Sequence, residues 1–161
     1  MIVIGGVPGT GKTSVAREIS KIINKPITQL NVIKFNYSKK WNSLIVEPIK
    51  TEGYIIEGHL TCEVQLNDTI FILRTNPFEL ERRLKNRKYS QMKIWENMMA
   101  EALDYCPIKA EKYYNTIFEI DTTDIDPISV ANKIVNKQCS KTHISWKKEL
   151  EEMIKYDMQF M

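Results

Sequence analysis

The chain has 161 residues, 43% of them hydrophobic and 27% charged, which is typical of one soluble globular domain and excludes collagen-like, disordered and multidomain proteins. No apolar run approaches the roughly 20 residues of a membrane-spanning helix, and the N-terminus has no basic segment or cleavage site of a signal peptide, so we expect a cytoplasmic protein with no membrane contact. Three scattered cysteines without CxxC spacing indicate neither a disulfide framework nor a zinc site.

The net charge is only +3, but the positive charge is concentrated at residues 82–93. The six basic residues there, with no acidic residue among them, are Arg82, Arg83, Lys85, Arg87, Lys88 and Lys93. Such a run is typical of a solvated helix face, and it also suits a segment that binds phosphate or RNA.

Predicted strands and helices alternate along the chain. A β-branched apolar run at 2–4 predicts a strand buried on both faces, and apolar residues at 3.6-residue spacing predict a helix over 12–23. The strand pattern recurs at 54–56, 69–73 and 116–120. Amphipathic segments that predict helices lie at 78–84, 93–103 and 128–135. This alternation predicts one α/β domain over 1–161, with a parallel sheet covered by helices on both faces in a three-layer sandwich. We expect five strands in the sheet, one more than these four runs.

Two segments fit the alternation less well. Residues 31–50 mix aromatic and basic side chains and contain a proline, and we expect a helical insertion there. Residues 145–160 place Trp146, Leu150, Met153, Ile154 and Asp157 on one face, which predicts an appended C-terminal helix packed on the core.

The strongest motif is GVPGTGKT at 6–13, which matches G-x-x-x-x-G-K-[ST] between a predicted strand and a predicted helix, the context that the motif requires. Its glycines allow successive backbone N–H groups to converge on an anion, and the helix N-terminus adds positive partial charge. Lys12 would then bridge the β- and γ-phosphates of ATP, and Thr13 would offer its hydroxyl to Mg²⁺. The motif therefore predicts a site for Mg²⁺ and ATP.

A second candidate pair follows the strand at 54–56. In a phosphate-loop protein, an acid just beyond an apolar strand can hold Mg²⁺ through its water shell, and Glu57 is at that position. His59 can orient or deprotonate a water or a substrate hydroxyl because imidazole titrates near neutral pH, although a lone histidine is more often structural.

With these motifs the chain resembles the small adenylate-kinase-like P-loop proteins of archaea and eukaryotic nuclei, which are described both as adenylate kinases and as ATPases that assist small-ribosomal-subunit maturation. The resemblance runs along nearly the whole chain. It rests on GVPGTGKT, on Glu57-Gly58-His59-Leu60 where the family commonly has Asp-x-His, on the lid entry R-L-x-x-R-x-Y at 83–89 where the family has R-L-x-x-R-G-Y, and on Asp121-Thr122-Thr123.

The resemblance implies the fold of P-loop nucleoside monophosphate kinases and the reaction ATP + AMP to 2 ADP, together with ATPase activity. It implies that the ATP phosphates are bound by Gly9, Gly11, Lys12, Thr13 and Ser14. Glu57 and His59 would form the Mg²⁺ and water-activating pair, and Arg87, in a short lid at 82–93, would clamp the transferring phosphate. Asp121, Thr122 and Thr123 would approach the adenine, although they could equally cap the helix at 128–135. A ribosomal protein of the small-subunit platform would be a partner, and RNA contact stays open.

One departure bears on the phosphate acceptor. In the family's eukaryotic members, the segment for the nucleoside monophosphate is longer and contains an arginine, whereas this chain has no arginine between Arg17 and Arg74, and Tyr37 falls near that position. An alternative function is therefore a nucleotide-switched ATPase module that binds a ribosomal protein and retains only vestigial kinase activity. A kinase acting on a nucleoside or on shikimate would fit the P-loop, but it would not fit the segment at 57–60.

Overall fold

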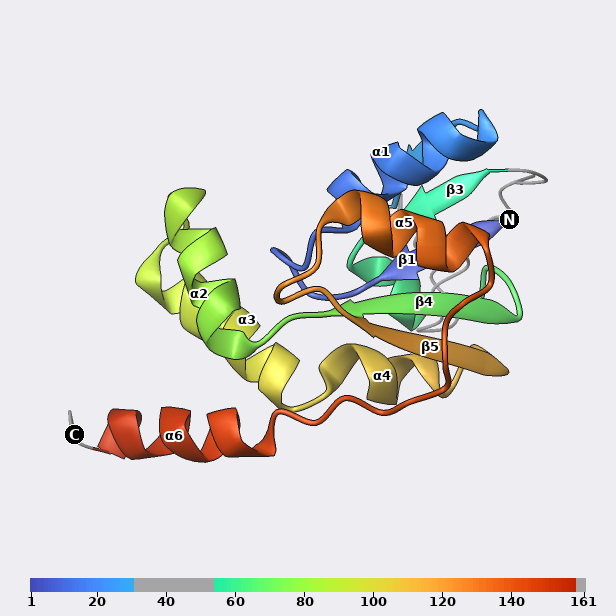
Figure 1. Cartoon of the computed structure of the whole chain (residues 1–161). Coiled ribbons are helices and arrows are strands. Elements are labelled where there is room, and N and C mark those ends of the chain that lie inside the picture. The colour runs from blue at the N-terminus through green and yellow to red at the C-terminus, as the bar shows by residue number, and fades with distance from the viewer. Residues whose placement is uncertain (31–53, 159–161) are drawn as a thin grey trace, which may run out of the picture.

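A computed structural model describes residues 1–30 and 54–158 (Figure 1). In chain order these residues form β1 (Ile2–Gly5), α1 (Lys12–Ile23), β2 (Ile27–Gln29), β3 (Ile55–Glu57), the 3₁₀ helix η1 (Leu60–Glu63), β4 (Thr69–Arg74), α2 (Pro77–Asn86), α3 (Gln91–Ala102), α4 (Tyr105–Ala110), β5 (Thr116–Asp121), α5 (Pro127–Val135) and α6 (Lys147–Met158). The insertion predicted at 31–50 lies outside the described residues.

The five strands form one parallel sheet in the order β2-β3-β1-β4-β5, which confirms the predicted sheet. β1 is central, and the chain returns on one side of it as β3 and on the other as β4. The carboxyl end of β1 is therefore a topological switch point, the position at which open α/β sheets bind ligands.

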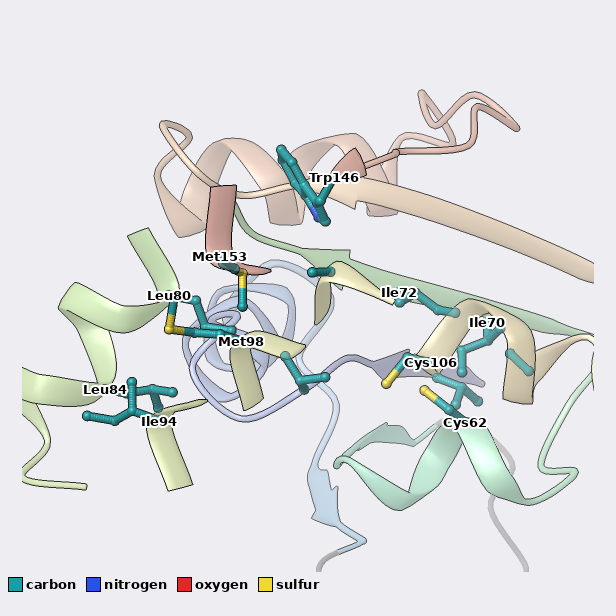
Figure 2. Close-up of a cluster of buried hydrophobic side chains, with 14 of the residues drawn as sticks. Cys62, Ile70, Ile72, Leu80, Leu84, Ile94, Met98, Cys106, Trp146 and Met153 are labelled. Carbon is teal, nitrogen blue, oxygen red and sulfur yellow. The ribbon is translucent and has the colours of Figure 1, made fainter. Parts of the chain in front are cut away.

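Alternate residues of each strand are buried on opposite faces of the sheet, because successive side chains of a strand point in opposite directions. Val3 and Ile72 belong to the core that α2, α3 and α4 cover, whose side chains are shown in Figure 2. Ile4 and Leu73 belong to the core that α1 and α5 cover. These two cores confirm the predicted three-layer sandwich, and Figure 1 shows α5 and α4 on opposite sides of the sheet.

Besides the single turn η1, two elements were not predicted. β2 is only three residues long, and its sequence, Ile-Thr-Gln, contains no apolar run. α4 is six residues long and contains Pro107. Both elements are too short to show a hydrophobic periodicity in the sequence, and their positions depend on the neighbouring chain segments.

The appended helix is present as α6, and Figure 1 shows it extending away from the sheet. Trp146 and Met153 are buried in the core on the α2 and α3 side, and Leu150 packs against it. Ile154 was predicted on the packed face, but it is 45% exposed, because α6 buries only a narrow stripe against a single neighbouring layer. Of the helices within 1–30 and 54–158, none has the length and apolar character needed to cross a bilayer.

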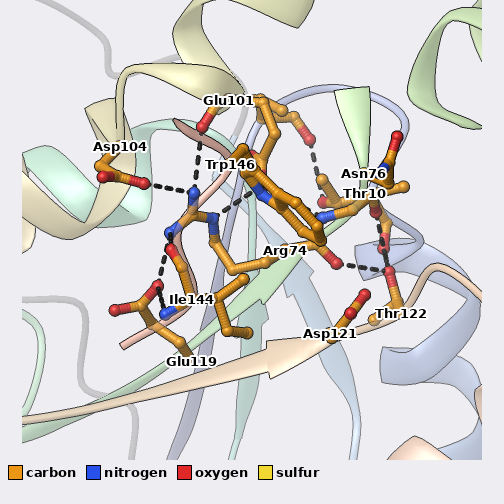
Figure 3. Close-up of polar contacts among 12 residues, drawn as sticks. Thr10, Arg74, Asn76, Glu101, Asp104, Glu119, Asp121, Thr122, Ile144 and Trp146 are labelled. Atoms are coloured by element: carbon orange, nitrogen blue, oxygen red, sulfur yellow. Dashed lines mark hydrogen bonds and ion pairs between the residues drawn. The ribbon is translucent and has the colours of Figure 1, made fainter. Parts of the chain in front are cut away.

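A buried ionic network ties this extension to the sheet (Figure 3). Arg74, at the end of β4, is fully buried and pairs with Glu101 at 2.6 Å, with Asp104 at 2.5 Å and with Glu119. Glu101 also accepts a hydrogen bond of 3.0 Å from the indole N–H of Trp146. Burial lowers the pKa of Arg74, but the three carboxylates outweigh this effect and raise it overall.

Candidate active site

The loop between β1 and α1 lies at the switch point. Gly9 and Gly11 have φ values of 97° and 93°, a conformation that residues with a β-carbon rarely adopt. A β-carbon at Gly11 would meet no atom within 4 Å, so this glycine is required by the backbone conformation rather than by crowding. Helix α1 begins immediately afterwards at Lys12, and its free N–H groups therefore face the loop.

Two cavities adjoin along this loop and share Gly9, Gly11, Ser14 and Arg87 in their linings. The first has a volume of about 340 Å³ and is lined on its other sides by Lys12, Thr13, Gln29, Glu57, His59 and Tyr89. The second has a volume of about 250 Å³ and extends toward the loop after β5 and the start of α5. The structure thus brings the predicted phosphate-loop residues together with Glu57, His59 and Arg87.

Lys12 lies in the wall of the first cavity, and its Nζ donates a hydrogen bond of 2.8 Å to the carbonyl of Val7. The side chain is 9% exposed. Burial lowers the pKa of Lys12, and the nearby Glu57 partly opposes this effect. An anion in the cavity would stabilise the ammonium form, so the position favours a negatively charged ligand.

Glu57 ends β3, is nearly fully buried, and faces Thr13 across the first cavity. The Thr13 hydroxyl donates to Oε1 of Glu57 at 2.9 Å, and Nε2 of Gln29 donates to the same oxygen at 2.8 Å. Gln29 was not found from the sequence, because it lies in the unpredicted β2, whose register pairs it with Glu57. This pairing holds the carboxylate in place beside the phosphate loop.

The hydroxyl of Thr13 and the carboxylate of Glu57 are hard oxygen ligands of the kind that Mg²⁺ prefers. Within 1–30 and 54–158, no group of three or more His, Cys, Asp or Glu residues is placed to hold a metal ion. These two residues therefore fit a cation that takes most of its ligands from phosphate and water, which is how Mg²⁺ is bound in phosphate-transfer sites.

His59 is exposed, lies just before η1 and lines the first cavity. Gly58, between Glu57 and His59, leaves no room for a side chain, since a β-carbon there would lie 2.5 Å from the carbonyl oxygen of Leu30. The Leu30 N–H donates to the Glu57 carbonyl at 2.8 Å. The glycine thus lets the chain after β2 pass close to β3, and the residues on either side of it face the cavity.

Arg83 lines the second cavity and was not singled out from the sequence, where it is one member of a basic run. Its Nε donates to Glu79 at 2.7 Å, and its Nη2 donates to the carbonyls of Thr122 and Thr123 at 2.7 and 3.0 Å. The guanidinium is therefore fixed at the wall of this cavity. Apolar lining residues of the same cavity are Val15, Ile125, Pro127 and Val130. An apolar wall beside a planar cation is suited to bind a flat aromatic ring.

Ion pairs reduce the positive charge predicted at 82–93. Glu79 pairs with Arg82 and Arg83, and Glu81 pairs with Lys85, each at 2.7 Å. Each acid lies about one helical turn before its basic partner, so both acids fall just outside the segment as predicted. The segment itself comprises the end of α2, a turn at 87–90 and the start of α3. Arg87 lies in that turn and lines both cavities.

The residues of the segment at 121–123 differ in their positions relative to the second cavity. The carboxylate of Asp121 accepts from Thr123 N at 2.8 Å and from Thr123 Oγ1 at 2.5 Å, and it does not line the second cavity. Thr122 does line that cavity. The alternative role of this segment as a helix cap is wrong, because α5 is capped by Asp126, whose Oδ1 accepts from Ser129 N at 2.9 Å.

Comparison with known proteins finds relatives along most of the chain. Residues 2–72 match the family described as ATPase family associated with various cellular activities (AAA). Relatives bearing the name "Putative adenylate kinase" cover most of the chain. The protein of Pyrococcus furiosus is 32% identical over 97% of this chain and 96% of its own length. That of Archaeoglobus fulgidus is 30% identical over 99% and 98%, and that of Saccharolobus solfataricus is 32% identical over 86% and 83%.

Solved structures agree with the fold. Deoxyadenosine kinase from M. mycoides with bound dCTP has a TM-score of 0.53 at 16% identity, over 86% of this chain and 98% of its own. Shikimate kinase from Acinetobacter baumannii in complex with shikimate has a TM-score of 0.54 at 16% identity, over 85% and 91%. These likenesses confirm the fold of P-loop kinases.

Proposed function

Since the chain belongs to the archaeal family that carries the name "Putative adenylate kinase", we propose that it transfers the γ-phosphoryl group of ATP to AMP or another nucleoside monophosphate, with ATP hydrolysis as a second activity. The observation that carries this proposal is the first cavity, where Lys12, the Thr13–Glu57 pair and Arg87 line one space beside the phosphate loop. These are the groups that phosphoryl transfer requires, a phosphate cradle, a metal position and a mobile cation.

In this proposal the loop N–H groups and Lys12 bind the β- and γ-phosphates. Mg²⁺, when bound by Thr13 and by Glu57 through water, neutralises charge on the same phosphates. An oxygen of the AMP phosphate forms a bond to the γ-phosphorus while the bond from that phosphorus to the β-γ bridging oxygen breaks, and the electron pair remains on ADP. Arg87, exposed in the turn after α2, closes over the transferring group and stabilises its developing charge.

The second cavity takes the adenine base. Its apolar wall and the fixed guanidinium of Arg83 suit a flat ring, and its shared boundary at Ser14 and Arg87 joins it to the phosphate cavity. Of the three residues predicted to approach the adenine, the proposal retains Thr122, which lines this cavity.

His59 is proposed to act in hydrolysis rather than in transfer to AMP. A water molecule must lose a proton as it attacks phosphorus, and an imidazole can accept it. The phosphate of AMP needs no such base, because a phosphate monoester with a second pKa near 6 is already largely dianionic at neutral pH. The same site can therefore run two reactions that depend differently on one side chain.

The rival function is a nucleotide-switched ATPase without kinase activity, and the missing arginine in the predicted acceptor segment is the observation that favours it. Small-ribosomal-subunit maturation, a ribosomal-protein partner and RNA contact at 82–93 stay predictions from the sequence resemblance.

Transfer of label from [γ-³²P]ATP separates the two functions. With Mg²⁺ and AMP, a kinase places the label in the β-position of ADP formed from AMP, whereas an ATPase releases it as inorganic phosphate whether or not AMP is present. We expect labelled ADP to be the main product. Label found only in inorganic phosphate would refute the kinase proposal in favour of the rival function.

Matched histidine variants test the division of labour at the same site. His59→Ala should reduce phosphate release by at least about tenfold and change transfer to AMP much less. His143→Ala is the control, because His143 contacts Glu119 and Asp104 away from both cavities beside the loop. Equal loss of both reactions in His59→Ala would assign the side chain to nucleotide binding instead of water activation.

A further inference from the structure

One backbone carbonyl of the phosphate loop, that of Thr10, is contacted by the side chain of Thr122 from the loop after β5 (Figure 3). The hydroxyl of Thr122 lies 3.0 Å from the carbonyl oxygen of Thr10 and 2.9 Å from that of Arg74. Thr122 is 4% exposed, and Thr10 is fully buried. The two threonines are far apart in the sequence, and the sheet brings them together.

The Thr122 hydroxyl has two carbonyl oxygens and one further hydroxyl within hydrogen-bond distance. The carbonyl of Arg74 already accepts the Thr122 backbone N–H at 2.8 Å. Thr75 Oγ1 lies 2.8 Å from Thr122 Oγ1, and Arg83 Nη1 donates to Thr75 Oγ1 at 3.4 Å. A guanidinium can only donate, so Thr75 Oγ1 accepts from Arg83, and either hydroxyl can be the donor between Thr75 and Thr122. Toward the Thr10 carbonyl, which can only accept, the Thr122 hydroxyl is the donor.

These contacts link the guanidinium at the second cavity, through two hydroxyls, to the phosphate loop. Among the residues at 1–30 and 54–158, the hydroxyl of Thr122 is the hydrogen-bond donor to the Thr10 carbonyl.

The orientation of this carbonyl determines the orientation of the next N–H. A trans peptide is planar, and its C=O and N–H point in opposite directions; the described residues contain no cis peptide bond. With the Thr10 carbonyl directed to Thr122, the Gly11 N–H is directed to the other side of the loop. Gly11 itself does not enforce this orientation, because glycine adopts many backbone conformations at little cost.

We propose that Thr122 is a positioning residue for phosphate binding, which holds the Thr10–Gly11 peptide so that the Gly11 N–H faces the phosphates of the nucleotide. The proposal rests on the proposed function, since the ligand is a nucleoside triphosphate. It assigns Thr122 a role beyond the adenine contact expected from the sequence, because its hydroxyl acts on the phosphates through the loop.

Equilibrium binding of two probes tests this role. The probes are ATP and inorganic tripolyphosphate, which has the phosphate chain but no base, and titration calorimetry gives each dissociation constant. Thr122→Val, which replaces the hydroxyl with a methyl group, should weaken both probes by the same factor of about three to ten, the effect of one neutral hydrogen bond. Thr122→Ser should restore both affinities. Thr116→Val is the matched control, because Thr116 begins β5, the strand that ends just before Thr122, at its opposite end.

The outcomes separate the possible roles. Unchanged ATP affinity in folded Thr122→Val overturns the inference, and so does a loss for ATP with no loss for tripolyphosphate, since that pattern places Thr122 at the base alone. A wild-type chain that binds neither probe overturns the proposed function together with the inference. If the valine variant does not fold, Thr122→Ala removes the same hydroxyl without adding a methyl group in its place, and the same expectations apply.

Discussion

Replacement of Arg74 by leucine should destabilise the protein severely, because it leaves carboxylates unpaired in the interior. Arg74 is fully buried, and the side chain of its partner Glu101 is 1% exposed, whereas those of Asp104 and Glu119 are 23% and 8% exposed. Asp104 can regain water with little rearrangement, but Glu101 cannot. Removing one member of a buried ion pair costs about 3–5 kcal/mol, a large fraction of the roughly 5–15 kcal/mol by which a domain is stable.

The loss of stability in Arg74→Leu should depend on pH, and the direction of this dependence follows from the pKa of Glu101. Burial already raises the pKa of Glu101, against the opposing effect of Arg74, so removing Arg74 raises it further. The folded variant then holds a proton that the unfolded chain releases above its ordinary pKa of about 4.3. Because the folded state binds more protons in this range, the stability of the variant increases as pH falls from 8 toward 5. The difference from wild type should therefore shrink at lower pH.

Urea denaturation followed by circular dichroism at pH 8 and at pH 5.5 measures both effects. Arg82→Leu is the control, since Arg82 pairs with Glu79 on the exposed face of α2 and its loss should change stability little at either pH. In Arg74→Leu/Glu101→Gln, the amide carries no charge, and part of the lost stability should return. A loss below about 1 kcal/mol in Arg74→Leu, or a loss equal at the two pH values, would refute the assignment of Glu101 as the uncompensated charge.

Three further substitutions have defined outcomes. Glu57→Gln should raise the Mg²⁺ concentration for half-maximal rate by about 10-fold, while Glu63→Gln, in η1 and outside both cavities, should not; equal shifts would remove Glu57 from the metal position. Arg87→Lys should lower kcat at least about tenfold with little change in ATP affinity, because lysine lacks the planar fork, and an unchanged kcat would argue against the clamp. Lys88→Gly should stabilise the fold by about 1 kcal/mol in urea denaturation, because Lys88 has a φ of 58°, a left-handed conformation that favours glycine, and the family pattern has glycine there; a loss of stability would refute that reasoning.

The sequence alone determined the phosphate loop, the helix after it and the alternation that builds the sheet. These features are encoded locally, since glycines at positive φ, a helix start and a buried strand each depend on a few consecutive residues. Glu57 could be found in the same way, because a buried strand ends at it and the carboxyl ends of parallel strands lie on one edge of a sheet.

Only the tertiary structure decided what the other polar side chains contact. Gln29 reaches Glu57 because the very short β2 pairs with β3, and no local pattern predicts that strand. Arg83 looked like one member of a basic run, yet Glu79 and the carbonyls after β5 hold it at the second cavity. Arg74 finds its carboxylates in α3, in β5 and just after α3. The sequence does not specify the partners of a charged side chain. The pairing depends on which ends of strands and helices lie together at one edge of the folded sheet.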